Sequence, residues 1–177
     1  VIGEVHNYFG VSSRSIKSVV VLGGSRTAIN LAKILSREDI SLRIIEKDPI
    51  KCAYLTDLLP QATIINQDGT TDEVIKNEKL GQADAFIAST RQDEVNVMSG
   101  LLVKNVGSEN VMVQLTNPSY VPIVNRLGII HTPSPRIIAA NRILALSLTS
   151  SIATLTTLYE NQAEIFEIHV SSQSTIT

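Results

Sequence analysis

A short glycine-containing segment, Leu22-Gly23-Gly24-Ser25-Arg26-Thr27-Ala28, has the residue types of a phosphate-binding turn. In a dinucleotide-binding fold the first glycine of such a turn makes a tight bend, the second lets backbone approach a pyrophosphate, and the third lets helix and strand pack closely. Gly23 takes the first position, Ser25 the second and Ala28 the third, where alanine is an accepted substitute. The Ser25 side chain stands where bare backbone would face phosphates, whereas the Arg26 guanidinium suits phosphate oxygens at a helix N-terminus. The segment therefore predicts either a phosphate-binding turn or a plain strand-to-helix turn without a ligand.

A carboxylate, Glu46, ends the next apolar run at close to the spacing, roughly 20 residues after the glycine turn, at which an acidic side chain holds an adenosine ribose. A carboxylate at that position disfavours a 2′-phosphate, so NAD or an adenine nucleotide is expected in preference to NADP. The neighbouring Lys47 could assist with a phosphate, although exposure to solvent is the commoner role of a lysine. Gly23, Arg26 and Glu46 together predict a nucleotide-binding site more strongly than any one of them.

The elements that would position these residues follow the pattern of a doubly wound parallel sheet. Between Lys17 and Thr132, short β-branched runs alternate with stretches that have apolar residues at three- and four-residue spacing. Six strands are expected, with almost wholly apolar cores because helices cover both faces; they are Ser18–Leu22, Ser41–Ile45, Thr63–Asn66, Ala85–Ser89, Val111–Leu115 and Ile129–His131. The sequence therefore predicts an α/β fold with a Rossmann-like sheet over residues 18–134.

The segment after the sheet is expected to begin with a rigid bend at Pro133-Ser134-Pro135 and to continue as one long helix, from Arg136 to about Tyr159. This helix is apolar over much of its circumference, so it needs burial either against a second subunit or domain or, equally, against its own domain. Beyond it, Ala163–Val170 alternates like an edge strand. We therefore divide the chain into a linker (1–17), the Rossmann-like domain (18–134), a crossover or dimerisation helix (135–160) and the start of a truncated β-rich domain (161–177).

Composition narrows the class of protein. The 177 residues carry a formal net charge of −2 and include no basic stripe, which argues against a nucleic-acid partner. The single cysteine, Cys52, cannot form an internal disulfide, and neither a signal peptide nor a membrane span is apparent, so a cytoplasmic location is expected. Since the chain begins at Val1 and ends in a polar Ser/Thr-rich tail, we expect a fragment of a longer polypeptide.

Groups that could carry out catalysis are missing from the sequence pattern. No Ser/His/Asp arrangement, no Cys/His cluster with metal spacing and no Walker phosphate loop is found. The histidines His6, His131 and His169 are scattered over a linker, a strand end and an edge strand. A binding module that is not an enzyme is therefore expected, and a fragment of an NAD-dependent oxidoreductase is the alternative.

Three segments of the chain resemble one known family. Ile44–Asp48, Gln67–Asp72 and Phe86–Met98 are similar to the KTN or RCK nucleotide-binding domain of Trk-type potassium uptake regulators, the TrkA N-terminal domain family. That family has G-D-A-T after its third strand and A-x-T-x-D-D-E-x-N after its fourth. The resemblance covers roughly Ser18 to Ser150, and Ala88–Met98 is its most specific part because ordinary dehydrogenases do not share it.

The resemblance implies a cytosolic regulatory subunit that forms a homo-oligomer, a dimer or a larger ring, and docks on a Trk-type membrane potassium transporter at the inner face of the membrane. Bound NAD(H), or ATP or ADP in its place, would shift the ring between conformations; a structural lobe without a ligand is the third interpretation. The residues placed around the nucleotide are Gly23, Ser25, Arg26 and Thr27 at the phosphates, Glu46 at the ribose with Lys47 beside it, Asp68, Gly69 and Thr70 at the adenine, and Ser89, Thr90 and Glu94 across the cleft. Glu94, with Asp93, is equally consistent with capping the helix that follows.

Overall fold

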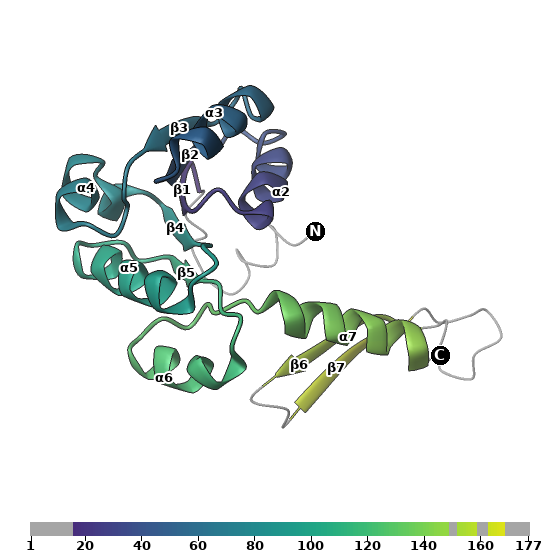
Figure 1. Cartoon of the computed structure of the whole chain (residues 1–177). Coiled ribbons are helices and arrows are strands. Elements are labelled where there is room, and N and C mark those ends of the chain that lie inside the picture. The colour runs from purple at the N-terminus through teal and green to yellow at the C-terminus, as the bar shows by residue number, and fades with distance from the viewer. Residues whose placement is uncertain (1–15, 149–151, 159–162, 169–177) are drawn as a thin grey trace, which may run out of the picture.

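A five-stranded parallel sheet forms the centre of the fold in the computed structural model, which describes residues 16–148, 152–158 and 163–168. Its strands lie in the order β3-β2-β1-β4-β5, as Figure 1 shows. They are β1 (Ser18–Leu22), β2 (Ser41–Glu46), β3 (Thr63–Asn66), β4 (Ala85–Ala88) and β5 (Val111–Val113). The chain runs outward from β1 to β3 and then returns to the other side of β1 for β4, so the strand order reverses between β1 and β4. The predicted Rossmann-like α/β sheet is confirmed.

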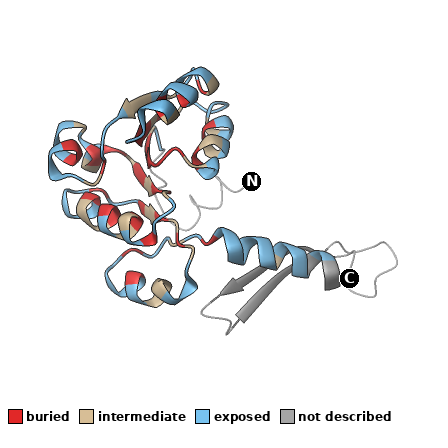
Figure 2. Cartoon of the chain, in the orientation of Figure 1, coloured by how far each residue is buried: buried red, intermediate tan, exposed pale blue. Residues whose placement is uncertain are grey.

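Helices cover both faces of this sheet, as the apolar strands require. The helices on one face are α2 (Arg26–Leu35) and α3 (Pro49–Leu58), which pack on alternate residues of β1 and β2. The opposite face holds α4 (Asp72–Asn77), the short 3-10 turn η1 (Leu80–Gln82), α5 (Asp93–Asn105), a second 3-10 turn η2 (Pro118–Tyr120) and α6 (Val121–Arg126). Strands β1, β2 and β4 are mostly buried, β3 at the edge of the sheet is intermediate or exposed, and the outer helix surfaces are exposed (Figure 2).

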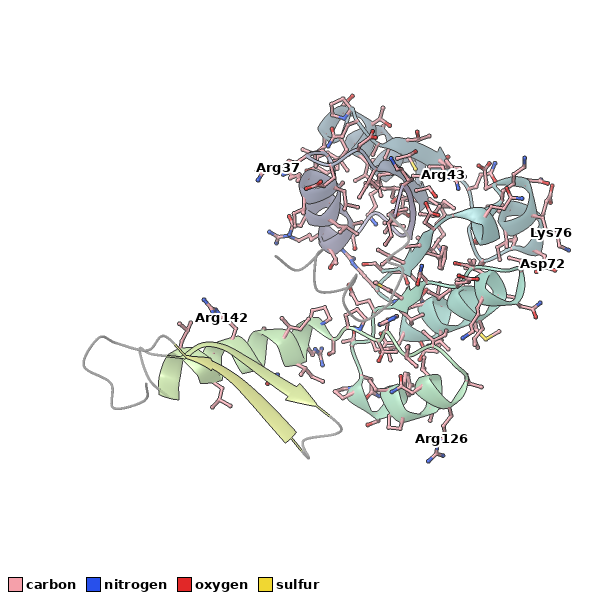
Figure 3. All side chains as sticks on the ribbon, turned by 180° about the vertical axis from the view of Figure 1, so that it is seen from behind. Arg37, Arg43, Asp72, Lys76, Arg126 and Arg142 are labelled. Atoms are coloured by element: carbon pink, nitrogen blue, oxygen red, sulfur yellow. The ribbon has the colours of Figure 1, made fainter. Side chains whose placement is uncertain are left out.

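Capping side chains fix where the helices begin. Ser25 accepts a hydrogen bond from the Ala28 N–H at the start of α2, and Asp48 accepts from two N–H groups at the start of α3, where Pro49 occupies the first turn. Thr71 caps α4 through the Val74 N–H. On the surface of α4, Asp72 and Lys76 form an exposed pair one helical turn apart, 3.7 Å between Oδ2 and Nζ (Figure 3).

The expected sixth strand, Ile129–His131, does not form as a strand. Only His131 makes an isolated parallel bridge, to Met112 of β5, and the His131 carbonyl accepts a hydrogen bond from the Val113 N–H at 2.9 Å. The Leu115 N–H then donates to the Pro133 carbonyl at 3.1 Å. Pro133 has no N–H to continue a ladder, so the segment lies beside β5 without extending the sheet.

The expected long helix is also shorter than the sequence pattern suggested. Helix α7 covers Pro135–Leu148, and β6 (Ile152–Leu158) pairs antiparallel with β7 (Ala163–Ile168) in a separate two-stranded sheet. The prediction of a helix to about Tyr159 is therefore wrong, because the Thr-rich alternation of β6 favours a strand over a helix. The predicted edge strand from Ala163 is confirmed as β7.

Helix α7 extends away from the Rossmann-like body, with the β6–β7 hairpin beside it (Figure 1). Along its length five large apolar side chains are 40–66% exposed: Ile137, Ile138, Ile143, Leu144 and Leu146. The interpretation in which this helix folds back on its own sheet is thus not what the structure shows. Residues 1–15 of the expected linker and the whole tail from residue 169 lie outside the described residues. Among those described, no helix is long and apolar enough to cross a bilayer.

Candidate functional site

A cleft of about 1290 Å³ opens at the carboxyl ends of β1, β2, β3 and β4. The loops that follow these four strands form its walls, and the adjoining turns of α2 and α3 form one rim. The strand order reverses between β1 and β4, beside the glycine turn. In open α/β sheets, ligands bind at such a switch point, outside the carboxyl ends of the strands. The fold therefore places the predicted residues where a ligand is expected.

Ten of the twelve residues expected at the site line this cleft. They are Gly23, Ser25, Arg26, Glu46, Lys47, Asp68, Gly69, Thr70, Ser89 and Thr90. The other two lie elsewhere. Thr27 is exposed on the first turn of α2, and Glu94 borders a separate pocket of about 460 Å³, where its Oε1 accepts a hydrogen bond from the Tyr120 hydroxyl at 3.3 Å. The structure thus separates Glu94 from the group that the sequence placed together.

The glycine turn is held in shape by close contacts that side chains would disturb. Gly23 has φ +94°, and a Cβ there would lie 3.0 Å from Thr90 Cγ2 and 3.1 Å from the Ser89 carbonyl oxygen. A Cβ on Gly24 would overlap the Leu55 side chain of α3. Gly24 therefore lets α3 pack against the turn. No such packing role for Gly24 was predicted from the sequence.

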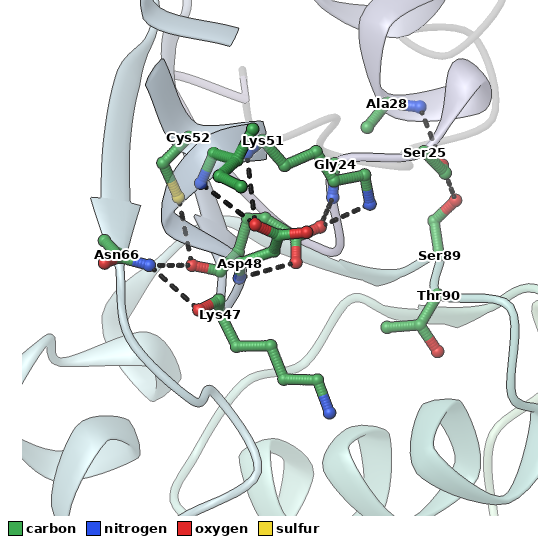
Figure 4. A network of polar contacts seen from close by, with 12 residues as sticks. Gly24, Ser25, Ala28, Lys47, Asp48, Lys51, Cys52, Asn66, Ser89 and Thr90 are labelled. Carbon is green, nitrogen blue, oxygen red and sulfur yellow. Dashed lines mark hydrogen bonds and ion pairs between the residues drawn. The ribbon is translucent and has the colours of Figure 1, made fainter. Parts of the chain in front are cut away.

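Ser25 uses its hydroxyl within the protein. Its Oγ accepts the Ala28 N–H at 3.2 Å and lies 2.8 Å from the Ser89 Oγ (Figure 4). Ser89 in turn donates to Gln114 Oε1 at 3.0 Å. Since Ser89 gives its proton to Gln114, Ser25 must donate to Ser89. The serine that replaces bare backbone thus ties the turn after β1 to the end of β4 and to the residue after β5. The Ala28 N–H is thus taken up by Ser25, whereas the N–H groups of Arg26 and Thr27 have no acceptor within the helix and stay available to an anion at the turn.

Glu46 is the centre of a second network and is only 7% exposed. Its Oε2 accepts the Gly24 N–H at 2.8 Å and the Lys51 ammonium at 2.7 Å, and its Oε1 accepts the Asp48 N–H at 3.1 Å. Asn66 Nδ2 holds the same turn by donating to the Glu46 and Lys47 carbonyls (Figure 4). Lys51 and Asn66 were not predicted, because their distance from Glu46 along the sequence gives no signal of contact.

The surroundings of Glu46 keep it ionised. Burial alone would raise the pKa of Glu46, but hydrogen bonds from Lys51, Gly24 and Asp48, with the positive charge of Lys51, outweigh burial and lower the pKa below its ordinary value. A carboxyl group whose pKa is lower in the folded than in the unfolded state stabilises the fold above its unfolded pKa. That stabilisation is lost as the pH falls through the folded pKa.

Replacing Glu46 by glutamine is expected to lower the free energy of unfolding by about 1–3 kcal/mol at neutral pH, because hydrogen bonds to a charged group are lost and Lys51 loses its partner. The difference from the wild type should shrink below about pH 4.3, the ordinary pKa of a glutamate, as the wild-type carboxyl takes up its proton. Urea titrations across this pH range measure it. Glu109→Gln, at an exposed position, is the control and should change stability little at neutral pH. A Glu46→Gln penalty that stayed constant down to pH 3 would contradict this account.

The loop after β3 contributes a compact polar turn. Asp68 Oδ1 accepts hydrogen bonds from the Thr70 hydroxyl at 2.6 Å and the Thr70 N–H at 3.0 Å. These two bonds lower the pKa of Asp68 although slight burial opposes them. Gly69 between them is buried, and a Cβ there would lie 2.6 Å from Leu22 Cδ1 and 3.1 Å from Ile45 Cγ2. The turn therefore brings a carboxylate to the cleft while its central residue packs on the sheet.

The far wall of the cleft is fixed from α5. Asn96, fully buried, accepts the Thr90 N–H at 2.8 Å and the Thr90 hydroxyl at 2.6 Å through Oδ1, and its Nδ2 donates to the carbonyls of Thr90 and Gln114. Asp93, 8% exposed, accepts the N–H groups of Thr116 and Asn117 at 2.8–2.9 Å. Asp93 thus joins α5 to the loop after β5.

Charge in the cleft favours an anionic ligand. Its lining carries five cationic side chains against three carboxylates: Arg26, Lys33, Lys47, Lys51 and Arg91 against Glu46, Asp48 and Asp68. A helix N-terminus adds partial positive charge beside Arg26. The residues present therefore fit the phosphates of a nucleotide. No group of three metal-ligating side chains occurs among the described residues, and burial raises the pKa of the Cys52 thiol, whose Sγ donates to the Glu46 carbonyl.

The chain is similar to known proteins both in sequence and in fold. Residues 19–135 match the family model of the TrkA-N domain. The chain is 30% identical over 174 residues to the Trk system potassium uptake protein trkA homolog 1 of Methanosarcina mazei, an alignment that covers 98% of this chain and 43% of that protein. Two solved structures share the fold at 14% identity. The TrkA-N domain of inner membrane protein ybaL from Escherichia coli has a TM-score of 0.66, with 76% of this chain and 98% of that one covered. The GsuK channel bound to NAD has a TM-score of 0.67, with 84% and 26% covered.

Proposed function

Because the chain belongs to the TrkA-N domain family, we propose that it is a regulatory nucleotide-binding domain of a potassium uptake system, and that it controls a membrane potassium transporter rather than catalysing a reaction. The chain spans less than half the length of the M. mazei relative. That the partner is a transporter and that it carries potassium are therefore both proposed for this chain. A cytosolic position on the inner face of the membrane, through that partner, follows from the same role.

The observation that carries the proposal is the cleft at the switch point of the sheet. It combines a helix N-terminus and Arg26 for phosphates with the Glu46 carboxylate for a ribose, and its volume of about 1290 Å³ suits a nucleotide. The GsuK channel has been solved with NAD and also with ADP. NAD(H) is the ligand that we favour for this chain, with ATP or ADP as the alternative. When bound, the nucleotide would supply no chemistry beyond its charge and shape.

Regulation would pass from the cleft to α7 through hydrogen-bonded segments. Ser25 and Ser89 join the glycine turn to Gln114, and the next residue, Leu115, donates its N–H to Pro133, just before α7. A ligand that binds one arrangement of these segments more tightly shifts the equilibrium between them, by about 1.4 kcal/mol for a tenfold difference in affinity. The exposed apolar side chains of α7 are where we place contact with a second copy of the chain in a homo-oligomer.

Two measurements test the proposal. Calorimetry of the 177-residue chain with NADH, ATP and ADP, each up to about 1 mM, a concentration that detects free energies of binding near −4 kcal/mol, should show saturable binding of at least one of them. Deletion of the gene should slow potassium uptake at limiting external potassium, and a plasmid-borne copy should restore it. Normal uptake in the deletion strain would refute the transport role.

The same experiments separate the alternatives. A structural lobe would restore potassium uptake yet bind none of the nucleotides, and Ser25 in the glycine turn is the feature that favours this outcome. A fragment of an NAD-dependent oxidoreductase would bind NADH and leave potassium uptake unchanged. The structural use of the Ser25 hydroxyl, turned toward Ser89, lessens the conflict between this serine and a bound phosphate.

A further inference from the structure

Most of the acceptor capacity of the Glu46 carboxylate is used within the chain. A carboxylate offers about four lone-pair sites, and three donors already occupy Glu46: the N–H groups of Gly24 and Asp48 and the ammonium of Lys51. The two backbone donors are fixed by the glycine turn and by the start of α3. A ribose with free 2′- and 3′-hydroxyls can donate two hydrogen bonds, but only about one lone-pair site of Glu46 is free. The second hydroxyl therefore needs the lone-pair site that accepts from Lys51.

Lys51 is the one donor of the three that can move. Its side chain is 39% exposed, against 8% for the side chain of Glu46, and a lysine has four rotatable bonds between its backbone and its ammonium. It stands on α3 and lines the cleft together with Glu46. Its ammonium has three N–H donors, of which one reaches Glu46. The remaining donors suit an acceptor in the cleft, and a phosphate oxygen is the strongest such acceptor in a nucleotide.

Resting on the proposed function, we propose that Lys51 sets the discrimination of this site between a ribose with a free 2′-hydroxyl and a ribose that carries a 2′-phosphate. The 2′- and 3′-hydroxyls of a free ribose compete with Lys51 for Glu46, and this competition weakens the binding of a nucleotide that has a free 2′-hydroxyl. A 2′-phosphate leaves the Lys51–Glu46 pair intact and accepts the other N–H groups of Lys51. The site therefore accepts NADPH as well as NADH.

The charge balance supports this assignment. A lone buried carboxylate repels a 2′-phosphate, which is why Glu46 by itself predicts NAD over NADP. In the structure Lys51 lies 2.7 Å from Glu46 and neutralises it, and exposed Lys47 adds a further positive charge at the same end of the cleft. The preference for NAD over NADP that Glu46 alone would impose is thus removed by Lys51.

A comparison of two lysine variants tests the role of Lys51. Calorimetry should give the ratio of the dissociation constants of NADPH and NADH for the wild type, Lys51→Met and Lys47→Met. In Lys51→Met the ratio should rise at least about tenfold, because NADPH loses a charge-assisted contact and NADH gains access to Glu46. Lys47→Met removes the same charge without touching Glu46 and should change the ratio by less than about threefold.

The outcomes distinguish this inference from the function on which it rests. If the wild type binds both dinucleotides and Lys51→Met leaves their ratio unchanged, the role of Lys51 is refuted and the nucleotide site stands. If Lys47→Met changed the ratio of the NADPH and NADH dissociation constants as much as Lys51→Met does, the role of Lys51 would be refuted too, since the ratio would then depend on the net charge of the cleft. If the wild type binds neither dinucleotide nor any adenine nucleotide, the nucleotide site falls and this inference with it. Lys51→Arg, which keeps the charge and the Glu46 contact, should retain the wild-type ratio and covers the case in which Lys51→Met does not fold.

Discussion

Replacing Gly23 by alanine is expected to lower the free energy of unfolding by about 2–4 kcal/mol. The left-handed backbone at Gly23, with φ +94°, costs a residue with a Cβ roughly 1–2 kcal/mol. The new methyl group would also lie 3.0–3.1 Å from Thr90 Cγ2, Thr90 Cα and the Ser89 carbonyl oxygen. Two of these atoms belong to backbone, so the end of β4 must shift, and forced repacking of this kind costs typically 1–3 kcal/mol. Denaturant titrations measure the loss.

Gly107 supplies a matched control for the backbone contribution. Gly107 also has a positive φ, +114°, but a Cβ there would meet nothing nearer than 3.8 Å. Gly107→Ala should therefore lose only the conformational part, about 1–2 kcal/mol. The difference between the two variants measures the contact of the turn with Ser89 and Thr90. Equal losses at both positions would show that the turn does not press against β4.

The central sheet was predictable because its signals are local. Each of β1 to β5 contains a short apolar run between turn-forming residues, and Ser25, Asp48-Pro49 and Thr71 are capping residues that act within three positions of themselves. The location of ten site residues at one cleft follows from the same pattern, since the carboxyl ends of parallel strands share one edge.

The errors arose where a local pattern was ambiguous. The chain is rich in Ile, Leu and Ala on both sides of Thr149-Ser150-Ser151, and a run of Ile, Leu, Thr and Ala fits a helix or a strand until a pairing partner, here β7, decides. Ile129–His131 has the composition of a strand, yet Pro133 ends its hydrogen bonding after a single bridge. Whether a segment becomes a strand depends on its neighbours in space, which one sequence does not show.

The hydrogen-bond networks of the site could not be predicted for a further reason. They join residues that are distant along the chain: Ser25 with Ser89, Ser89 with Gln114 and Glu46 with Gly24. Lys51 stands on α3, and no spacing rule singles it out. Asn96 is the last residue of the motif that begins at Ala88, but the motif does not say which groups the Asn96 side chain contacts. Their importance follows from burial and from the number of donors and acceptors that they satisfy.

Asn96→Ala is expected to lower the free energy of unfolding by about 2–4 kcal/mol, the largest polar effect that we expect in this chain. Asn96 is 0% exposed and makes four hydrogen bonds, three to Thr90 and one to the Gln114 carbonyl. Each buried group left without a partner costs roughly 1–3 kcal/mol, offset where water enters the space. Exposed Asn105 on the same helix is the control, and Asn105→Ala should change stability by less than about 0.5 kcal/mol.

Asn96→Asp separates the two halves of this side chain. One carboxylate oxygen can still accept both Thr90 groups, but the other would face the Thr90 and Gln114 carbonyl oxygens that now accept from Nδ2. The protonated form can donate to one of these carbonyls, so the folded state should raise the pKa of the introduced carboxyl. The stability of the variant relative to the wild type should then be greatest below about pH 3.9, the unfolded value, and fall as the pH rises through the folded pKa. A variant that gained stability relative to the wild type with rising pH would show that the Nδ2 bonds do not hold the far wall of the cleft, and that Thr90 is held from elsewhere.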